Sequence, residues 1–280
     1  MRRVDIIATL GPSTHSPEII REMALAGVDG CRINLSHADA DQARELVTKV
    51  RRVSEELDKK IYIVLDLRRR KMRLGKFPAP VELRNGQHYI LTTEDVPGGA
   101  DRATVTDPEI THRVFPGDTI FLSDRRVQLQ VEEIRDAAIH CLVQVGGTVD
   151  SGKGVNVPGI LGRPRPLSSK DRADIDLGAE LKVEQLYLSF AEDQEDVSNV
   201  REYLNQISSK ISLWPKIETA QGVHAIEEIL AVSDGICVAR GDLGTELQPE
   251  ELPIAQKRIL GLCSQRGVPC SMGGQVMDSM

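Results

Sequence analysis

Short apolar segments alternate with longer amphipathic segments along this sequence, and the alternation limits the folds that the chain can adopt. Residues 4–10, 30–36 and 61–67 are predicted strands, and the stretches 16–27 and 40–57 between them have helical spacing. Strands that are apolar on both faces are typical of parallel sheets covered by helices. Repeated strand–helix units of this length therefore predict an α/β fold with right-handed crossovers.

The alternation of short apolar and longer amphipathic segments resumes after residue 166. Four more strands are predicted there, at 185–190, 211–218, 235–244 and 269–274, and the first three precede amphipathic stretches. We therefore predict a TIM-type (β/α) barrel with seven strands, whereas a closed barrel of this class needs eight. The eighth strand comes from a partner, the barrel is open, or the sequence given is incomplete. An uncovered edge predicts a homo-oligomer or a partner chain that covers it.

The region between the third and fourth strands has a different character. Turn signals separate short β-rich runs in residues 76–164, and helical periodicity is absent. This pattern predicts a small all-β domain inserted into the barrel, whose two parts are then residues 1–75 and 165–280. Linkers rich in Gly and Pro flank the insert, and an insert on two such hinges can close over a ligand as a lid.

Composition excludes several classes of protein. The net charge is −7 and aromatic residues make up 3% of the chain, which argues against a nucleic-acid binder. No apolar run approaches the roughly 20 residues that a membrane span needs, and the N-terminus has no signal-peptide pattern. The five cysteines form no C-x-x-C pair, so we interpret them as reduced packing residues in a cytoplasmic protein.

Candidate chemical groups lie at the predicted carboxyl ends of the strands, where barrels of this class place their active sites. Lys216 and Glu218 are two residues apart on one strand, so their side chains point the same way. Asp242 follows the next strand, and Glu218 and Asp242 together suit Mg²⁺. Lys216 can neutralise a transferring phosphoryl group, and the turn with Gly241 and Gly244 offers N–H groups to an anion. The alternative is a buried Lys–Glu–Asp salt-bridge cluster.

Five motifs, in this order, resemble the signatures of the pyruvate kinase family. They are TLGPS (9–13), CRINLSH (31–37), PKIE (215–218), VARGDLG (238–244) and QVMDSM (275–280). The β-rich insert, which ends in KGVNVPG (153–159), is similar to the mobile B domain of that family. The resemblance covers nearly the whole chain and implies phosphoryl transfer between phosphoenolpyruvate and ADP, giving pyruvate and ATP.

The resemblance also implies a role for each matching residue. Lys216 matches the lysine that supports phosphoryl transfer, Arg32 an arginine on the transferring phosphate, and Arg73 a second active-site arginine. Glu218 and Asp242 match the ligands of Mg²⁺ (or Mn²⁺). The implied monovalent-cation site comprises Asn34, Ser36, Asp66, Leu67 and Lys71. The implied substrate-binding residues are Ser189, Lys216, Gly241, Asp242 and Gly274. The implied nucleotide-binding residues are Pro12, Arg32, Asn34, His37, Arg73 and Lys153.

The third strand end resembles the potassium-independent subgroup of the family. Leu67, Lys71 and Leu74 stand where potassium-dependent members have Thr, Glu and Thr. An ammonium group can take the place of a monovalent cation, so we predict that Lys71 supplies this charge and that K⁺ is not required. The alternative is a solvated basic loop.

The sequence also departs from the family pattern. Arg69 and Arg70, within the run Arg68–Arg70, replace a Gly-Pro pair that fixes a tight backbone path. Gly274 replaces a Thr near the phosphate and the enol carbon, which predicts slower phosphoryl transfer or enol protonation. Glu192 replaces an Arg after the fourth strand. The family's regulatory C-terminal domain has no counterpart in the sequence, so we do not expect control by sugar phosphates.

Three functions are consistent with these observations. The first is the pyruvate kinase reaction, with small-molecule substrates and neither nucleic acid nor membrane as partner. The second is a diverged enzyme on the same scaffold, acting on another enolpyruvate or 2-keto acid, since a metal and a lysine together stabilise an enolate. The third is a non-catalytic metabolite-binding subunit.

Overall fold

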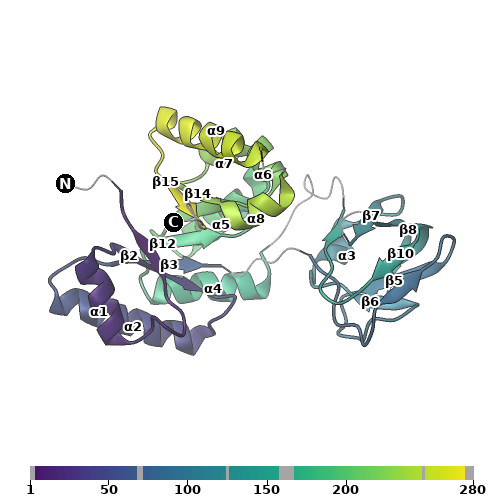
Figure 1. Cartoon of the computed structure of the whole chain (residues 1–280), viewed down its shortest axis with the longest axis horizontal. Coiled ribbons are helices and arrows are strands. Elements are labelled where there is room, and N and C mark those ends of the chain that lie inside the picture. The colour runs from purple at the N-terminus through teal and green to yellow at the C-terminus, as the bar shows by residue number, and fades with distance from the viewer. Residues whose placement is uncertain (1–3, 68–71, 124–125, 158–166, 248–249, 275–280) are drawn as a thin grey trace. The chain divides into compact units, whose positions relative to one another are not determined.

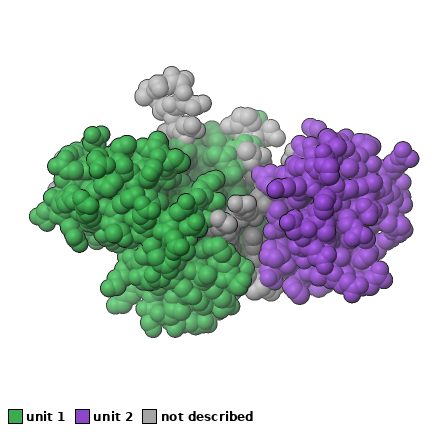
Figure 2. Space-filling view, turned by 90° about the horizontal axis from the view of Figure 1, so that it is seen from below, with its two compact units in different colours: residues 1–69, 166–280 green, residues 70–165 purple. Residues whose placement is uncertain are grey.

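The computed structural model describes residues 4–67, 72–123, 126–157, 167–247 and 250–274 of the chain. The chain divides into two compact units, which Figure 2 shows in different colours. Unit 1 comprises residues 1–69 and 166–280, and unit 2 comprises residues 70–165.

Unit 1 contains a parallel sheet of seven strands, as the sequence predicts. Its order is β1-β2-β3-β12-β13-β14-β15, and every neighbouring pair is parallel. The strands are β1 (Ile7–Thr9), β2 (Gly30–Asn34), β3 (Tyr62–Asp66), β12 (Gln185–Leu188), β13 (Ser212–Ile217), β14 (Ile236–Ala239) and β15 (Cys270–Gly273). Because all strands run the same way, their carboxyl ends lie at one edge of the sheet. Within the described residues, no eighth strand pairs with β1 or β15.

Helices follow the strands and pack against the sheet (Figure 1). They are α1 (Pro17–Ala26), α2 (Ala40–Glu56), α4 (Ser169–Glu180), α5 (Gln194–Gln206), α6 (Ala220–His224), α7 (Ile226–Ala231), α8 (Arg240–Glu246) and α9 (Glu251–Arg266). Some of their starts are marked by capping residues: Ser16 caps α1, and Asp39 and Gln42 form a capping box at α2. Helix α4 was not among the predicted segments, although Ser168 and Asp171 form a capping box there too.

Alternate residues of the strands pack into two different clusters, one on each face of the sheet. The larger cluster joins the helices to residues such as Leu65, Leu186 and Leu213. The smaller cluster, on the opposite face, comprises Val64, Tyr187, Trp214 and Cys237. The rings of Tyr187 and Trp214 stack with centroids 6.1 Å apart.

Unit 2 is built mainly from antiparallel strands. It contains a six-stranded sheet of order β11-β7-β8-β9-β5-β6 and a two-stranded sheet of β10 and β4, around its own apolar core. The strands are β4 (Val81–Leu83), β5 (His88–Thr92), β6 (Arg102–Thr104), β7 (Thr119–Leu122), β8 (Val127–Arg135), β9 (Ala138–Val145), β10 (Gly147–Val149) and β11 (Val155–Asn156). A helix of four residues, α3 (Ile110–Arg113), is also present, and it is too short to show helical periodicity in the sequence.

Two further observations concern the chain as a whole. Among the described residues, no helix combines the length and apolar character that crossing a membrane requires. The five cysteines are free thiols, and four of them are buried.

Candidate active site

Five polar side chains converge at the carboxyl ends of four neighbouring strands in unit 1. Arg32 lies on β2, Asp66 ends β3, Ser189 follows β12, Lys216 lies on β13, and Glu218 follows the same strand. The parallel sheet brings these positions together although they are up to 186 residues apart in sequence. Of these residues, Lys216 and Glu218 were predicted from the strand ends, and Arg32, Asp66 and Ser189 were implied by the family resemblance.

Asp66 is the centre of this cluster. Its carboxylate is 1% exposed and accepts hydrogen bonds from Arg32 Nε, at 2.7 Å, and from Ser189 Oγ, at 3.0 Å. Arg32 Nη2 contacts the same carboxylate, and Arg32 Nη1 donates to Thr9 Oγ1 at 2.9 Å. Lys216 Nζ lies 3.4 Å from Asp66 Oδ2. One buried acid therefore orients both cationic side chains of the site.

Lys216 and Glu218 form a buried ion pair. Lys216 Nζ lies 2.9 Å from Glu218 Oε1 and donates to Ser189 Oγ at 3.1 Å. The backbone N–H of Phe190 donates to Glu218 Oε2 at 2.7 Å. Burial by itself would lower the pKa of Lys216, but the charges of Asp66 and Glu218 outweigh it and hold the pKa above its usual value. The lysine therefore remains an ammonium at neutral pH.

The surroundings of Glu218 favour its uncharged form, whereas those of Lys216 favour its charged form. Burial raises the pKa of Glu218 to about 7, and the nearby charge of Asp242 adds to the increase. Lys216 and the Phe190 N–H act against it. The ionised form of this carboxyl group is destabilised by burial, and a cation bound beside it would stabilise that ionised form.

The cluster borders a cavity of about 380 Å³. Arg32, Lys216 and Glu218 line it, together with the predicted site residues Gly241, Asp242 and Gly274. Sequence reasoning missed several other lining residues: Ile7, Thr9, Tyr187, Cys237, Ala239, Ser271, Met272 and Gly273. Thr9 belongs to the TLGPS motif at the first strand end, but nothing in the sequence indicates its hydrogen bond with Arg32. Tyr187 and Ser271, whose hydroxyl oxygens are 3.0 Å apart, come from strands that are not adjacent.

The carboxylates of the cavity fit a divalent cation. Within the described residues, no group of three or more His, Cys, Asp or Glu side chains is arranged to hold a metal. Mg²⁺ often takes only one or two protein carboxylates and keeps water or substrate oxygens as its other ligands. Glu218 and Asp242 line the same cavity, and Asp242 is exposed. The alternative of a buried cluster of Lys216, Glu218 and Asp242 therefore fails for Asp242, and the acid that joins the buried Lys216–Glu218 pair is Asp66.

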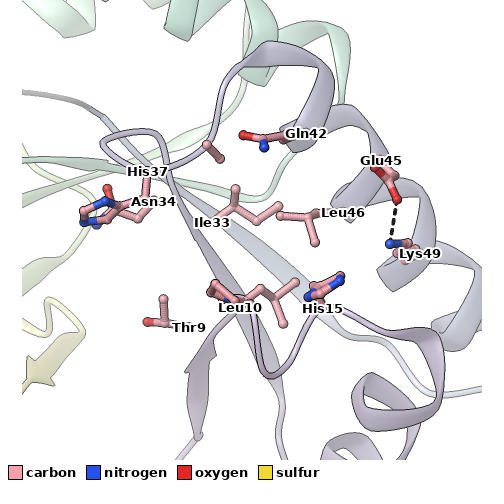
Figure 3. A pocket seen from close by; sticks show the side chains of 13 residues that line it. Thr9, Leu10, His15, Ile33, Asn34, His37, Gln42, Glu45, Leu46 and Lys49 are labelled. Atoms are coloured by element: carbon pink, nitrogen blue, oxygen red, sulfur yellow. Dashed lines mark ion pairs between the residues drawn. The ribbon is translucent and has the colours of Figure 1, made fainter.

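A second pocket lies beside the first, between the ends of β1 and β2 and helix α2 (Figure 3). Its volume is about 600 Å³, and three predicted nucleotide-binding residues line it: Pro12, Asn34 and His37. Sequence reasoning did not find His15, Gln42, Glu45 and Lys49, which also line the pocket. Glu45 Oε1 and Lys49 Nζ form an ion pair at 2.7 Å, visible as the dashed line in Figure 3.

The residues predicted for a monovalent cation are only partly described. Asn34 Oδ1 accepts a hydrogen bond from Ser36 N at 2.9 Å. Leu67 is buried, and its N–H donates to Tyr187 O at 2.9 Å. Lys71 and the run Arg68–Arg70 lie outside the described residues.

Two of the predicted site residues that the structure describes belong to unit 2, Arg73 and Lys153. Arg73 Nη1 donates to Gly152 O at 2.8 Å, which fixes the arginine against the turn before Lys153. The N–H of Leu74 donates to Lys153 O at 2.8 Å. Arg73 and Lys153 therefore lie close together within their own unit.

Comparisons with known proteins agree with this geometry. The family model described as "Pyruvate kinase, barrel domain" matches residues 1–280. The chain is 38% identical to pyruvate kinase of Thermotoga maritima and 34% identical to pyruvate kinase 2 of a Synechocystis strain. These matches cover 100% of this chain but 60% and 48% of the relatives, so the chain spans about half the length of the curated relatives. A crystal structure of a pyruvate kinase from Cryptosporidium parvum aligns with a TM-score of 0.76 at 31% identity, covering 99% of this chain and 59% of that one.

Proposed function

Because the chain belongs to the pyruvate kinase family, we propose that it transfers a phosphoryl group from phosphoenolpyruvate to ADP, giving pyruvate and ATP. One observation carries the proposal. The Lys216 ammonium is held by Asp66, Ser189 and Glu218 beside a cavity that Arg32 and Asp242 also line. A fixed positive charge of this kind, facing a cavity, is suited to a phosphoryl group that develops negative charge in transfer.

Each side chain has a distinct task in this proposal. Lys216 and Arg32 neutralise the phosphoryl oxygens and the developing enolate oxygen. Asp66 touches both cationic groups, so it positions them before substrate enters. Ser189 accepts a hydrogen bond from Lys216 and donates one to Asp66, which fixes the direction of the lysine.

Glu218 and Asp242 are the residues proposed to hold Mg²⁺ or Mn²⁺. When bound, the cation supplies positive charge to the phosphoryl and carboxylate oxygens of the substrate. The shared cavity of Glu218 and Asp242 supports this assignment, and a neighbouring cation would favour the ionised form of Glu218, whose pKa burial raises to about 7. Gly241 and Gly274 are proposed to line the phosphoenolpyruvate or pyruvate site, since both border the same cavity.

The pocket with Pro12, Asn34 and His37 is proposed to receive the nucleotide. Its apolar wall, which includes Leu10, Ile33 and Leu46, suits a base, and it adjoins Thr9 and Asn34 at the strand ends. Arg73 and Lys153 remain proposed nucleotide-binding residues on the strength of the motif resemblance.

We also propose that K⁺ is not required. Leu67 offers an apolar side chain where a potassium ligand would carry oxygen, and Asp66 already contacts two cationic side chains. Lys71 is proposed to supply the remaining charge. A cytoplasmic location and a partner or second copy at the β1 and β15 edges are further proposals, the latter supported by the absence of paired strands at those edges among the described residues.

A diverged activity is the second candidate, and Gly274 is the observation that favours it. Gly274 lines the cavity with a φ of 102°, a conformation that L-residues with side chains rarely adopt. The family pattern has a threonine at this position. Its hydroxyl is absent here, and the backbone conformation of residue 274 disfavours a threonine. Such a site would act on another enolpyruvate or 2-keto acid.

A coupled assay of pyruvate formation separates these candidates. With phosphoenolpyruvate, ADP and Mg²⁺ and without K⁺, the proposal predicts turnover that disappears when Mg²⁺ is chelated. Well-folded protein without turnover would reject the pyruvate kinase reaction. Exchange of the pyruvate methyl protons with solvent, without ATP formation, would then support the diverged enzyme.

A further inference from the structure

Two of the five cysteines lie at neighbouring ends of α9 and β15, both drawn in yellow in Figure 1. Cys263 is in the last turn of α9, on the same face as the buried residues Ala255 and Ile259. Cys270 is the first residue of β15. Seven positions separate the two cysteines, a spacing that no common dithiol motif predicts.

The chain reverses direction sharply between them. Gly267 has a φ of 66° and ends the helix, and Val268 N donates to Cys263 O at 2.9 Å. Ser271 bonds to Tyr187 on one face of the sheet, so its neighbour Cys270 points to the opposite face. On that face, Cys270 packs against the helix–sheet core that contains Cys263. The turn and the strand alternation therefore direct both side chains into the same helix–sheet core.

The two thiols also lie close enough to shift the pKa of each other. The Cys270 thiol lowers the pKa of Cys263, while the Cys263 thiol and burial raise the pKa of Cys270. By contrast, burial raises the pKa of Cys31 and Cys237 to about 11. Cys263 is 1% exposed and Cys270 is half-buried, so one sulfur of the pair can meet a reagent.

We propose that Cys263 and Cys270 form a modification site, a dithiol that small disulfides such as oxidised glutathione convert to an intramolecular disulfide. Loss of a proton from the pair gives the Cys263 thiolate, which takes the proton of the Cys270 thiol as Cys270 Sγ attacks one sulfur of oxidised glutathione and releases one glutathione thiolate. Cys263 Sγ then gives this proton to solvent, attacks Cys270 Sγ and displaces the second glutathione. Two protein thiols lose two protons and two electrons, and one glutathione disulfide becomes two glutathione thiols.

This bond would join the end of α9 to the strand that borders the site. Ser271, Met272 and Gly273 follow Cys270 directly and line the cavity. The modification is independent of the proposed catalytic function, because it needs only the fold of unit 1.

Peptide mapping of the full chain tests the proposal. Native protein is incubated with oxidised glutathione, quenched in acid, and alkylated with iodoacetamide after unfolding. Trypsin cleaves after Arg266, so the disulfide would link peptides 259–266 and 267–280. We expect this linked pair, a mass loss of about 2 Da for the intact chain, and alkylation of the remaining three of the five cysteines.

Two variants serve as matched controls. Cys141→Ala removes a buried thiol of unit 2 and should leave the linked pair unchanged. Cys270→Val should abolish the linked pair and leave Cys263 fully alkylated after unfolding. Five alkylated cysteines in the treated wild-type chain would overturn the proposal. A glutathione adduct on Cys270 with Cys263 alkylated would overturn it as well, because it would show that the second sulfur does not reach the first.

Discussion

Both units of the molecule bury an ion pair, but the two pairs are built differently. In unit 2, Arg113 Nη1 lies 3.4 Å from Asp107 Oδ2, and the two side chains are 5% and 7% exposed. These residues are six positions apart, at either end of one turn and a short helix. In unit 1, Lys216, Asp66 and Arg32 come from three different strands, and Lys216 and Arg32 line a cavity.

The difference shows that burial of charge does not by itself mark a functional site. A local pair such as Arg113 and Asp107 satisfies its own charges and fixes a loop. The cluster of unit 1 keeps charge at the wall of a cavity, with an acid whose pKa is raised to about 7, and this combination is typical of binding and catalysis. The following predictions test whether the two pairs differ in this way.

Replacement of Lys216 should have the largest effect. Lys216→Met removes the charge that the proposal places on the phosphoryl group, so kcat/KM in the coupled assay should fall by about 10³-fold. Arg52→Met, which removes an exposed arginine of α2, should leave turnover unchanged. A loss of less than about 10-fold in folded Lys216→Met protein would remove the lysine from the proposed chemistry.

Replacement of Asp107 should affect stability instead of turnover. Asp107→Asn removes the buried carboxylate charge that faces Arg113 Nη1, which should destabilise unit 2 by about 3 kcal/mol. Hydrogen exchange of peptides from residues 70–165 measures the loss. The matched control is Arg102→Met, which breaks an exposed ion pair with Asp101 in the same unit and should cost less than about 1 kcal/mol. Equal effects of the two substitutions would show that the buried pair has no special role.

The smallest expected effect concerns potassium. If Lys71 and the charges of the unit 1 cluster replace the charge of K⁺, added KCl should change kcat by less than about two-fold. Ionic strength is held constant with a tetramethylammonium salt. Lys71→Ala should then lower turnover without K⁺ and regain part of it when K⁺ is added. Strong stimulation of the unaltered chain by K⁺ would contradict the assignment of Lys71.

Much of unit 1 could be predicted from the sequence, because a parallel sheet imposes its own geometry. Strand-end positions predicted that Lys216, Glu218 and Asp242 lie at one edge, since every strand ends there. Arg32, Asp66 and Ser189 were expected from the family resemblance. The fold class and the seven strands follow from the same periodicity. Helix α4 was missed because its polar residues weaken the periodic signal, although its capping box was present.

Contacts between non-adjacent strands, or across a tight turn between a helix and a strand, could not be predicted. The bond between Tyr187 and Ser271 joins β12 to β15, which are not neighbours in the sheet. The placement of Cys263 and Cys270 at the same core depends on one left-handed glycine, Gly267. These features come from tertiary packing, and no residue pattern within a short window encodes them.

The central claim is that the cavity of unit 1 holds a divalent cation against an enolate-like anion. Isothermal titration calorimetry with oxalate, a mimic of the pyruvate enolate, tests it most directly. The account predicts oxalate binding in the presence of Mg²⁺, no binding in its absence, and loss of binding in Glu218→Gln protein. Oxalate binding that is equally strong without Mg²⁺, or unchanged by Glu218→Gln, would contradict the account.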